Sequence, residues 1–346
     1  MKTPSETPGR ESTVTTVLIH ADAGPTEGWG HLREALAVAK ALRTSTTTCK
    51  FILPIESPEA VIEAEAEGFA VVKTPAVDWQ SIEPSGQLID LLAKPDISFL
   101  VCDLVRVSPG YAALAGNLCD SWAIVTELRE DERADVNFNV SQSPQYMPLG
   151  PEYRRAAKRQ TRSRVRRILI NYGGSDPRNI TCQTLEMLRP AMTSGELPSD
   201  VSFVVVLGPL FAHSDAVSEI ASSYPVPVEI TGPLAPSEML VAVAQSDIAI
   251  TTAGGTMYEF CALGLPCIIV PDLDKQQANA KVLAGRGAVS MTSKLATLSN
   301  DELASAIREL LPAGPRETMT NRAQDEIDGQ GAERIADRLR QEWGIS

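Results

Sequence analysis

The feature that most constrains the fold of this sequence is an alternation between short apolar runs, rich in Val and Ile, and stretches whose apolar residues recur at helical spacing. Such alternation is typical of βαβ units, in which helices connect parallel strands. The run at 201–207 is nearly all apolar and rich in β-branched valine, which indicates a strand buried on both faces. The alternation restarts at Arg167. We therefore expect an α/β protein with two Rossmann-like units and parallel sheets.

The same patterns predict the individual elements. Strands are expected at 14–20, 49–54, 97–102, 121–125, 167–172, 201–207, 226–231, 248–252 and 267–270. Helices are expected at 31–42, 58–67, 110–119, 179–188, 237–245, 256–263, 275–285 and 332–343.

The length of 346 residues suggests two domains, at about 150 residues per domain. We expect a disordered leader, an N-terminal Rossmann-like domain, a basic linker, a C-terminal Rossmann-like domain and a C-terminal helix, with bounds at 1–13, 14–150, 151–166, 167–328 and 329–346. Two such domains facing each other bring the carboxyl ends of their strands around one interdomain cleft, where α/β sheets bind ligands.

The charge balance argues against nucleic acid as a partner. The sequence has 44 acidic and 31 basic residues, for a net charge of −13, whereas phosphate backbones require a basic face. One segment differs, because 154–167 carries eight basic residues and no acid. It is either a solvated linker helix between acidic domains or a surface for peripheral contact with an anionic membrane.

Targeting and metal-binding signals are missing from the sequence. No stretch reaches the ~18 consecutive apolar residues of a membrane span, and 1–13 lacks the apolar core of a signal peptide, so we expect a cytoplasmic protein. The six cysteines form no CxxC pair, and most lie within apolar runs. Buried thiols in a reducing compartment account for them, and no metal site or cofactor is expected.

The first candidate site is the segment Gly28-Trp29-Gly30-His31-Leu32-Arg33, which follows the first strand and opens the first helix. Glycines and free helix amides at such a turn attract anions. Arg33 replaces the last glycine of a dinucleotide fingerprint, which argues against NAD or FAD. The helix dipole would favour a neutral His31 imidazole, and hence a general base. The alternative is a helix-start histidine bonded to backbone.

The second candidate is the turn formed by Gly173, Gly174, Ser175 and Asp176, between a strand and a helix. Its backbone amides can cradle a phosphate or a sugar. The turn can equally be a plain βα connection with Asp176 or Ser175 as an N-cap. Spacing does not separate these two interpretations.

The third candidate is the run Ala253-Gly254-Gly255-Thr256-Met257-Tyr258-Glu259. Small residues at a helix entry expose amides to a diphosphate, and Glu259, one turn in, can accept both hydroxyls of a ribose. The competing interpretation is a capping box between Thr256 and Glu259.

A polar loop follows the strand expected at 267–270. Asp272 and Asp274 suggest a metal, but a loop that caps the next helix is the simpler interpretation. Gln276 and Asn279 can hydrogen-bond sugar hydroxyls.

These motifs in order resemble a family, the UDP-sugar hydrolases of pseudaminic acid biosynthesis, with the related spore-coat polysaccharide proteins and, more distantly, the UDP-GlcNAc transferase of peptidoglycan synthesis. The resemblance spans about 17–340. It is carried by Ala21-Asp22-Ala23, Gly28-x-Gly30-His31, Leu149-Gly150-Pro151-x-Tyr153, Tyr172-Gly173-Gly174-Ser175-Asp176-Pro177, Ala253-Gly254-Gly255-Thr256-x-Tyr258-Glu259, Ala262-Leu263-Gly264-x-Pro266, Gln276 with Asn279, and Asp328-Gly329-x-Gly331.

The resemblance implies a GT-B fold, with two Rossmann-like domains and a nucleotide sugar in the cleft. It implies that His31 with Asp22 performs the chemistry, without metal or cofactor. The nucleotide and sugar would be held by Gly28, Gly30, Arg33, Asp103, Gly173, Gly174, Ser175, Gly254, Gly255, Thr256, Glu259, Gln276 and Asn279.

The sequence departs from this family in its first half. His20 replaces the family's usual Arg, Leu104 follows Asp103 where a His or Asn is usual, and Trp29 is bulkier than the usual small residue. Thr126-Glu127 occupies the position at which the family carries an Asp-Asp pair. The match is therefore closer in the second half, which is expected to bind the nucleotide, than in the first half, which is expected to face the sugar.

The function that the resemblance implies is inverting hydrolysis of a UDP-linked acetamido or deoxy sugar by water, for surface glycan or nonulosonic acid biosynthesis. The alternative is an inverting glycosyltransferase on the same scaffold, which moves the sugar to an acceptor hydroxyl. A third possibility, from another class, is a nucleotide-sugar-binding protein without catalysis. The oligomeric state does not follow from the sequence.

Overall fold

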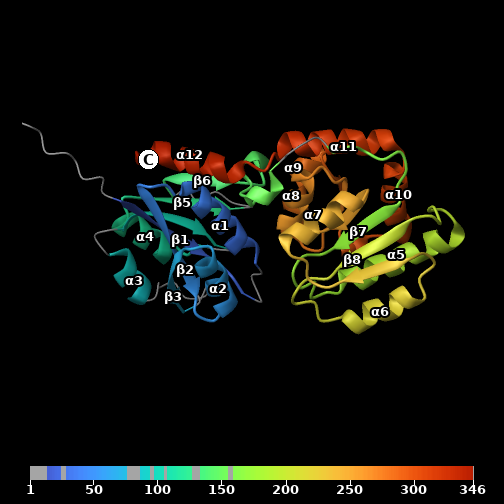
Figure 1. The fold of residues 1–346 in the computed structure, drawn as a ribbon, viewed down its shortest axis with the longest axis horizontal. Coiled ribbons are helices and arrows are strands. Elements are labelled where there is room, and N and C mark those ends of the chain that lie inside the picture. Colours follow the sequence, from blue (N-terminus) through green and yellow to red (C-terminus); the bar gives the residue numbers. More distant parts are fainter. Residues whose placement is uncertain are drawn as a thin grey trace, which may run out of the picture.

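The computed structural model describes residues 14–24, 29–75, 86–93, 97–104, 107–126, 133–154 and 159–345, so the leader expected over 1–13 lies outside the described residues. The described residues form two six-stranded sheets, and every paired strand within them is parallel. Figure 1 shows the two sheets side by side along the long axis, each flanked by helices. The predicted α/β fold with two parallel sheets is confirmed.

The first sheet has the strand order β3-β2-β1-β4-β5-β6. Its strands are β1 (Thr15–Ala21), β2 (Thr47–Pro54), β3 (Ala70–Thr74), β4 (Ile97–Asp103), β5 (Ser121–Thr126) and β6 (Val136–Asn139), and its helices are α1 (Gly30–Leu42), α2 (Pro58–Ala66), α3 (Gly86–Leu92) and α4 (Pro109–Leu118). Successive β1 residues face opposite sides: Val17 packs with α1 and α2, and Leu18 with α3 and α4.

The second sheet has the order β12-β11-β10-β7-β8-β9. Its strands are β7 (Arg167–Asn171), β8 (Ser202–Val206), β9 (Val228–Thr231), β10 (Ile248–Thr251), β11 (Cys267–Ile269) and β12 (Ser290–Met291). Its helices are α5 (Ile180–Ser194), α6 (Ser214–Ser222), α7 (Pro236–Gln245), α8 (Gly255–Ala262), α9 (Asp274–Gly285), α10 (Asn300–Leu310) and α11 (Ala313–Glu326). Counted within each half, the two sheets have the same strand order.

That order fixes where a ligand can bind. The strand order reverses between β1 and β4 in the first sheet and between β7 and β10 in the second. Open parallel sheets bind ligands at this switch point, beyond the carboxyl ends of the strands. The loops after β1, β4, β7 and β10 are therefore the places to look for a site.

The last helix, α12 (Gly331–Trp343), returns from the second half to pack on the first (Figure 1). The Trp343 indole stacks on Phe99 of β4, with ring centroids 4.7 Å apart. Its Nε1 donates a 2.9 Å hydrogen bond to the Ser121 hydroxyl, and Arg340 donates to the Ala41 carbonyl of α1. The predicted helix at 332–343 is confirmed, and it belongs spatially to the first half.

The sequence did not predict several elements of the structure. The strands β3, β6 and β12 are short, and all three lie at sheet edges. The helix α11 buries Arg316, Thr320 and Gln324 where an apolar stripe would be expected. The helices α3, α6 and α10 were also not predicted. Polar burial of the kind seen in α11 depends on tertiary partners, such as the Gly264 carbonyl that accepts from Thr320 at 2.8 Å.

The described residues 159–166 of the basic segment are not helical, so the linker helix that the sequence suggested is wrong for this part. Its arginines hold neighbouring parts of the fold. Arg159 donates to the Val243 carbonyl at 3.0 Å, and Arg162 donates to Asp247 at 2.9 Å. Burial lowers the pKa of Arg159 to about 10. Further ion pairs join Arg154 to Glu333, Arg166 to Asp200 and Arg167 to Glu229. Of the eight basic residues, Arg154, Arg162, Arg166 and Arg167 are thus paired with acids in the described part of the chain, and membrane contact through this segment stays a prediction.

Two further expectations concern cysteines and membranes. All six cysteines are buried free thiols, as their positions in apolar runs indicated. Within the described ranges, no helix has the length and apolar character needed to cross a membrane.

Candidate active site

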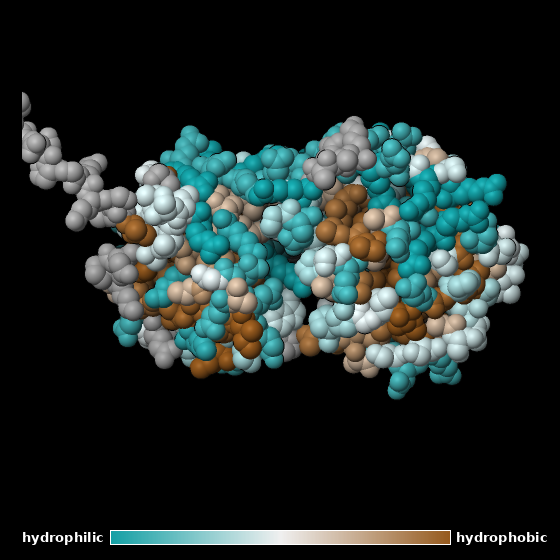
Figure 2. All heavy atoms as spheres, viewed as in Figure 1, coloured by the Kyte–Doolittle hydropathy of each residue, from teal (hydrophilic) through white to brown (hydrophobic). Residues whose placement is uncertain are grey.

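A cleft of about 640 Å³ lies between the two halves. The space-filling view is hollowed at this place (Figure 2). The first half contributes the start of α1 and residues 147–153, and the second half contributes the loops after β7, β8, β10 and β11. The cleft therefore lies at the edge that the strand order indicated.

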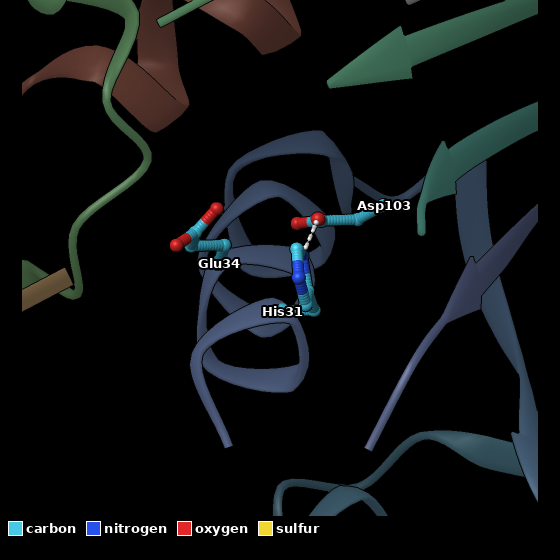
Figure 3. A group of neighbouring side chains, drawn as sticks. All are labelled: His31, Glu34 and Asp103. Carbon is cyan, nitrogen blue, oxygen red and sulfur yellow. Dashed lines mark hydrogen bonds and ion pairs between the residues drawn. The ribbon is translucent and has the colours of Figure 1, made fainter. Parts of the chain in front are cut away.

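His31 lies on the first-half wall of this cleft, in the first turn of α1. Its Nδ1 is 2.7 Å from Oδ1 of Asp103, the last residue of β4 (Figure 3). Since β1 and β4 are neighbours in register, the helix that follows β1 begins beside the end of β4. A carboxylate only accepts, so Nδ1 carries a proton, and in the neutral ring Nε2 then holds the lone pair. This is the arrangement of an oriented general base.

The structure changes the role expected for Asp103. The sequence-based expectation was contact with the substrate, but the Asp103 side chain is 2% exposed and lies behind His31. From there it accepts the Nδ1 proton, which fixes the tautomer of the neutral ring.

Asp22, expected to take part in catalysis, lies outside the described cleft wall. It is buried after β1, and its backbone N–H donates to the Asp103 carbonyl at 3.1 Å. His20 is also buried, with Nδ1 2.8 Å from the Tyr111 hydroxyl, and burial lowers its pKa to about 4. Among the three histidines of the sequence, His31 is the one that lines the cleft, since His213 is the N-cap residue of α6.

His31, Glu34 and Asp103 each place one potential metal ligand within 4.8 Å of the others (Figure 3). The direct hydrogen bond between His31 and Asp103 already explains the approach of that pair. Glu34 was not predicted from the sequence. Its position three residues after His31, one helical turn along the same face, is the signal that would have found it.

The glycine turn before α1 is described in part. Gly28 lies outside the described residues, whereas Gly30 and Arg33 line the cleft. The positive charge of Arg33 reaches the second half, where it counteracts the raised pKa of the Glu259 carboxyl. Arg33 is thus a cation of the first half that faces the ligand-binding loops of the second.

The loop after β7 differs from the expected N-cap, because the N-cap residue of α5 is Asn179, which accepts from the Cys182 N–H at 3.4 Å. Asp176 supports the same helix start by accepting from the N–H groups of Ile180 and Thr181, at 2.7 and 2.9 Å. The three residues before Asp176, Gly173-Gly174-Ser175, line the cleft. Gly173 has a φ of +80°, a conformation that favours glycine. The hydrogen bonds of Asp176 therefore hold the loop in a shape that presents its backbone to the cleft.

The capping-box interpretation of Thr256 and Glu259 is wrong. The N-cap residue of α8 is Gly254, in extended conformation and without a side-chain cap, and Gly255 is the first helical residue. The cleft is lined by all of Gly254, Gly255, Thr256 and Glu259. The amides at the start of α8 are therefore available to an anion from the cleft.

Glu259, one turn further along α8, has a raised pKa because burial penalises its charged form. The charge of Arg33 and a hydrogen bond from Tyr153 work in the opposite direction. This carboxylate therefore lies in the wall between the two halves, next to a cation and a phenol.

The polar loop after β11 caps the next helix, as predicted. Gln276 accepts from the N–H of Asp272 at 2.7 Å while also lining the cleft. Asp272 pairs with Arg178 and Asp274 with Lys294, which explains both acids without a metal.

The expectation that Asn279 contacts the sugar is not supported by its placement. Asn279 is 1% exposed. Its Oδ1 accepts from the Ser141 hydroxyl at 2.9 Å, and its Nδ2 donates to the Ala253 carbonyl at 3.4 Å. Asn279 thus joins the first half to the segment before Gly254.

The comparisons with known proteins agree with this geometry. Residues 234–339 match the model of the glycosyltransferase family 28 C-terminal domain. An uncharacterized protein of Methanocaldococcus jannaschii is 28% identical over 275 residues, or 73% of this chain and 55% of the relative. The spore coat polysaccharide biosynthesis protein SpsG of Bacillus subtilis is 26% identical over 224 residues, or 62% of each chain. The matches thus span just over half the length of these curated relatives.

Solved structures show the same architecture. The MurG structure from Acinetobacter baumannii has a TM-score of 0.68 at 17% identity, covering 94% of this chain and 99% of that one. The UDP-GlcNAc 2-epimerase of Neisseria meningitidis, bound to UDP-GlcNAc, has a TM-score of 0.61 at 14% identity over 94% and 100%. The spinosyn rhamnosyltransferase SpnG, complexed with thymidine diphosphate, has 0.61 at 15% over 96% and 100%. The chain therefore has a GT-B-like fold, and residues 234–339 in its second half match a glycosyltransferase family 28 C-terminal domain.

Proposed function

We propose that this protein is an inverting glycosyltransferase that moves a sugar from a UDP-linked donor to an acceptor hydroxyl. The observation that carries the proposal is the His31–Asp103 pair, 2.7 Å apart, on the wall of a cleft whose opposite wall is built from glycine-rich loops. The matched family model and the neighbours MurG and SpnG favour transfer over the hydrolysis that the sequence resemblance implied.

Donor binding is assigned to the second half. The N-terminus of α8 and the Gly173–Ser175 loop present backbone amides, which suit a diphosphate. Arg33 adds a positive charge from the first half, and Glu259 can accept from the ribose hydroxyls. That neighbours of the same fold were crystallised with UDP or thymidine diphosphate supports a nucleoside diphosphate as the ligand.

The chemistry is assigned to the first half. The Nε2 of His31 takes the proton from the acceptor hydroxyl as its oxygen bonds to the anomeric carbon. The bond from that carbon to the diphosphate oxygen breaks on the opposite face, so the configuration inverts and its electron pair leaves with UDP. Helix amides and Arg33 stabilise the charge that develops on the leaving diphosphate. Asp103 stabilises the imidazolium.

The finer identity of the donor rests on relatedness to SpsG, whose name places it in polysaccharide biosynthesis. We propose a UDP-linked acetamido or deoxy sugar used for a surface glycan. The alternative function is hydrolysis of a UDP-sugar, in which water takes the place of the acceptor hydroxyl and the same residues act.

The test is a screen of UDP-sugars by mass spectrometry, with and without candidate glycan acceptors. Transfer predicts release of UDP at catalytic turnover only when an acceptor is present, together with a product heavier by one sugar residue. Turnover without acceptor would replace transfer by hydrolysis. No UDP release under any condition would contradict both.

A further inference from the structure

Glu34 is a buried carboxylate in the cleft that the proposed mechanism does not use. The side chain is 6% exposed, and it lines the cleft one helical turn after His31. Burying a carboxylate is costly unless positive charge or hydrogen-bond donors stabilise it. Its surroundings therefore have to supply that stabilisation.

Two helix N-termini from opposite halves of the molecule lie beside this carboxylate. A β-carbon built on Gly30, the first residue of α1, would be 3.8 Å from Glu34 Oε1. A β-carbon built on Gly255, the first residue of α8, would be 3.9 Å from the same oxygen. Helix N-termini carry partial positive charge, so both attract this carboxylate.

The start of α8 is also the place to which the donor diphosphate is assigned. The α8 N-terminus has no side-chain cap of its own, and the Glu34 oxygen reaches it from across the cleft. Two anions cannot share this place without strong repulsion. A diphosphate at Gly255 would therefore require Glu34 to swing away.

We propose that Glu34 is a resident anion at the diphosphate end of the cleft, which the nucleotide donor has to displace. This inference rests on the proposed function, because it concerns the same site. Glu34 then sets donor affinity: part of the attraction between the diphosphate and α8 is offset by the loss of the contact between Glu34 and α8. The same competition favours release of UDP after transfer.

The experiment measures the dissociation constants of UDP, uridine and inorganic pyrophosphate by calorimetry for the unchanged protein and for Glu34→Gln. Glutamine keeps the size of the side chain and removes its charge. The expected result is UDP and pyrophosphate binding about 10-fold tighter in the variant, with uridine binding unchanged, because only the phosphates meet Glu34.

Glu63→Gln is the matched control. Glu63 lines the same cleft from α2, so this variant makes the same charge change away from α8, and its UDP affinity should stay within about 2-fold. If Glu34→Gln does not fold, Glu34→Asp draws the carboxylate back from α8 by one methylene and should also tighten UDP.

The outcomes separate this inference from the proposed function. Unchanged or weaker UDP binding in Glu34→Gln would overturn the resident anion while leaving the nucleotide site intact. Equal tightening in Glu34→Gln and Glu63→Gln would overturn it as well, because general cleft charge would then explain the effect. Failure of the unchanged protein to bind UDP or pyrophosphate would overturn the proposed function along with it.

Discussion

The two halves of this molecule share one strand order but differ at the edge of the sheet that faces the cleft. The first half presents ionisable side chains there, His31 and Glu34, with Asp103 behind them. The second half presents mainly backbone, at Gly173–Ser175 and Gly254–Gly255, with Glu259 one turn further in. Under the proposed function, the same scaffold provides side chains for proton transfer on one wall and amides for anion binding on the other.

This difference explains how an acidic chain can hold an anionic ligand. The net charge of −13 would repel a diphosphate if binding relied on the overall field. Helix N-termini and loop amides are local dipoles that act within the first turn, and they do not require lysines. The comparison therefore predicts that substitutions at His31 and Asp103 change turnover and that those in the second half change affinity, whereas Glu34 acts on affinity because it reaches α8.

The largest effect on turnover is expected from the first-half wall of the cleft. We expect His31→Ala to lower kcat by about 10²- to 10⁴-fold, because it removes the general base. UDP affinity and Tm should stay near those of the unchanged protein. His213→Ala, which removes a histidine at the N-cap of α6, is the control and should retain full turnover. Loss of UDP affinity in His31→Ala would contradict the assignment of proton transfer to His31 and of UDP binding to the second half.

A smaller loss of turnover is expected for Asp103→Asn, because the base remains but loses its orienting carboxylate. We expect kcat to fall by about 10²-fold, with KM and Tm little changed. The pH profile of kcat should shift, since the stabilisation of the imidazolium is lost, and a purely structural role would not produce this shift. An unaltered pH profile would argue against Asp103 as a positioning residue.

On the second-half wall of the cleft, Glu259→Gln should weaken UDP binding by about 1–3 kcal/mol, because a charge-assisted hydrogen bond to the ligand becomes a neutral one. Burial raises the pKa of Glu259, so its ionised form destabilises the folded chain at neutral pH. The variant should therefore have a higher Tm at pH 7, and the difference should shrink as the pH falls through the raised pKa. A lower Tm with unchanged UDP affinity would reverse this assignment.

The smallest effect is expected from chelation. We predict that EDTA leaves turnover unchanged, because the helix amides and Arg33 supply the stabilisation of the leaving diphosphate. Turnover that is lost in EDTA and restored by Mg²⁺ or Mn²⁺ would instead make His31, Glu34 and Asp103 a metal site.

The fold was predictable from the sequence because buried parallel strands are nearly continuous apolar runs, as in 201–207. Glycine turns at helix starts likewise indicated candidate positions, and both Gly174 and Gly255 line the cleft. The partners of polar side chains were not predictable. Asn279 joins two halves through Ser141, which is distant in sequence, and such a pairing has no local pattern.

The outcome for Thr256 and Glu259 illustrates the same limit. Their spacing fits a capping box, but α8 begins one residue before Thr256, and a shift of one or two residues in a helix start changes the role of every side chain near it. Helix starts of this kind depend on the packing of the preceding loop, which a sequence pattern does not contain.

The return of α12 to the first half has a consequence for how the chain reaches its native state. Trp343 and Arg340 complete a layer over Phe99, Ser121 and Ala41, yet they follow the strands and helices of the second half in sequence. During synthesis the second half can therefore fold from its own residues, whereas the first half gains its covering helix only after the second half has been made. The half that comes earlier in the sequence is thus completed after the half that follows it.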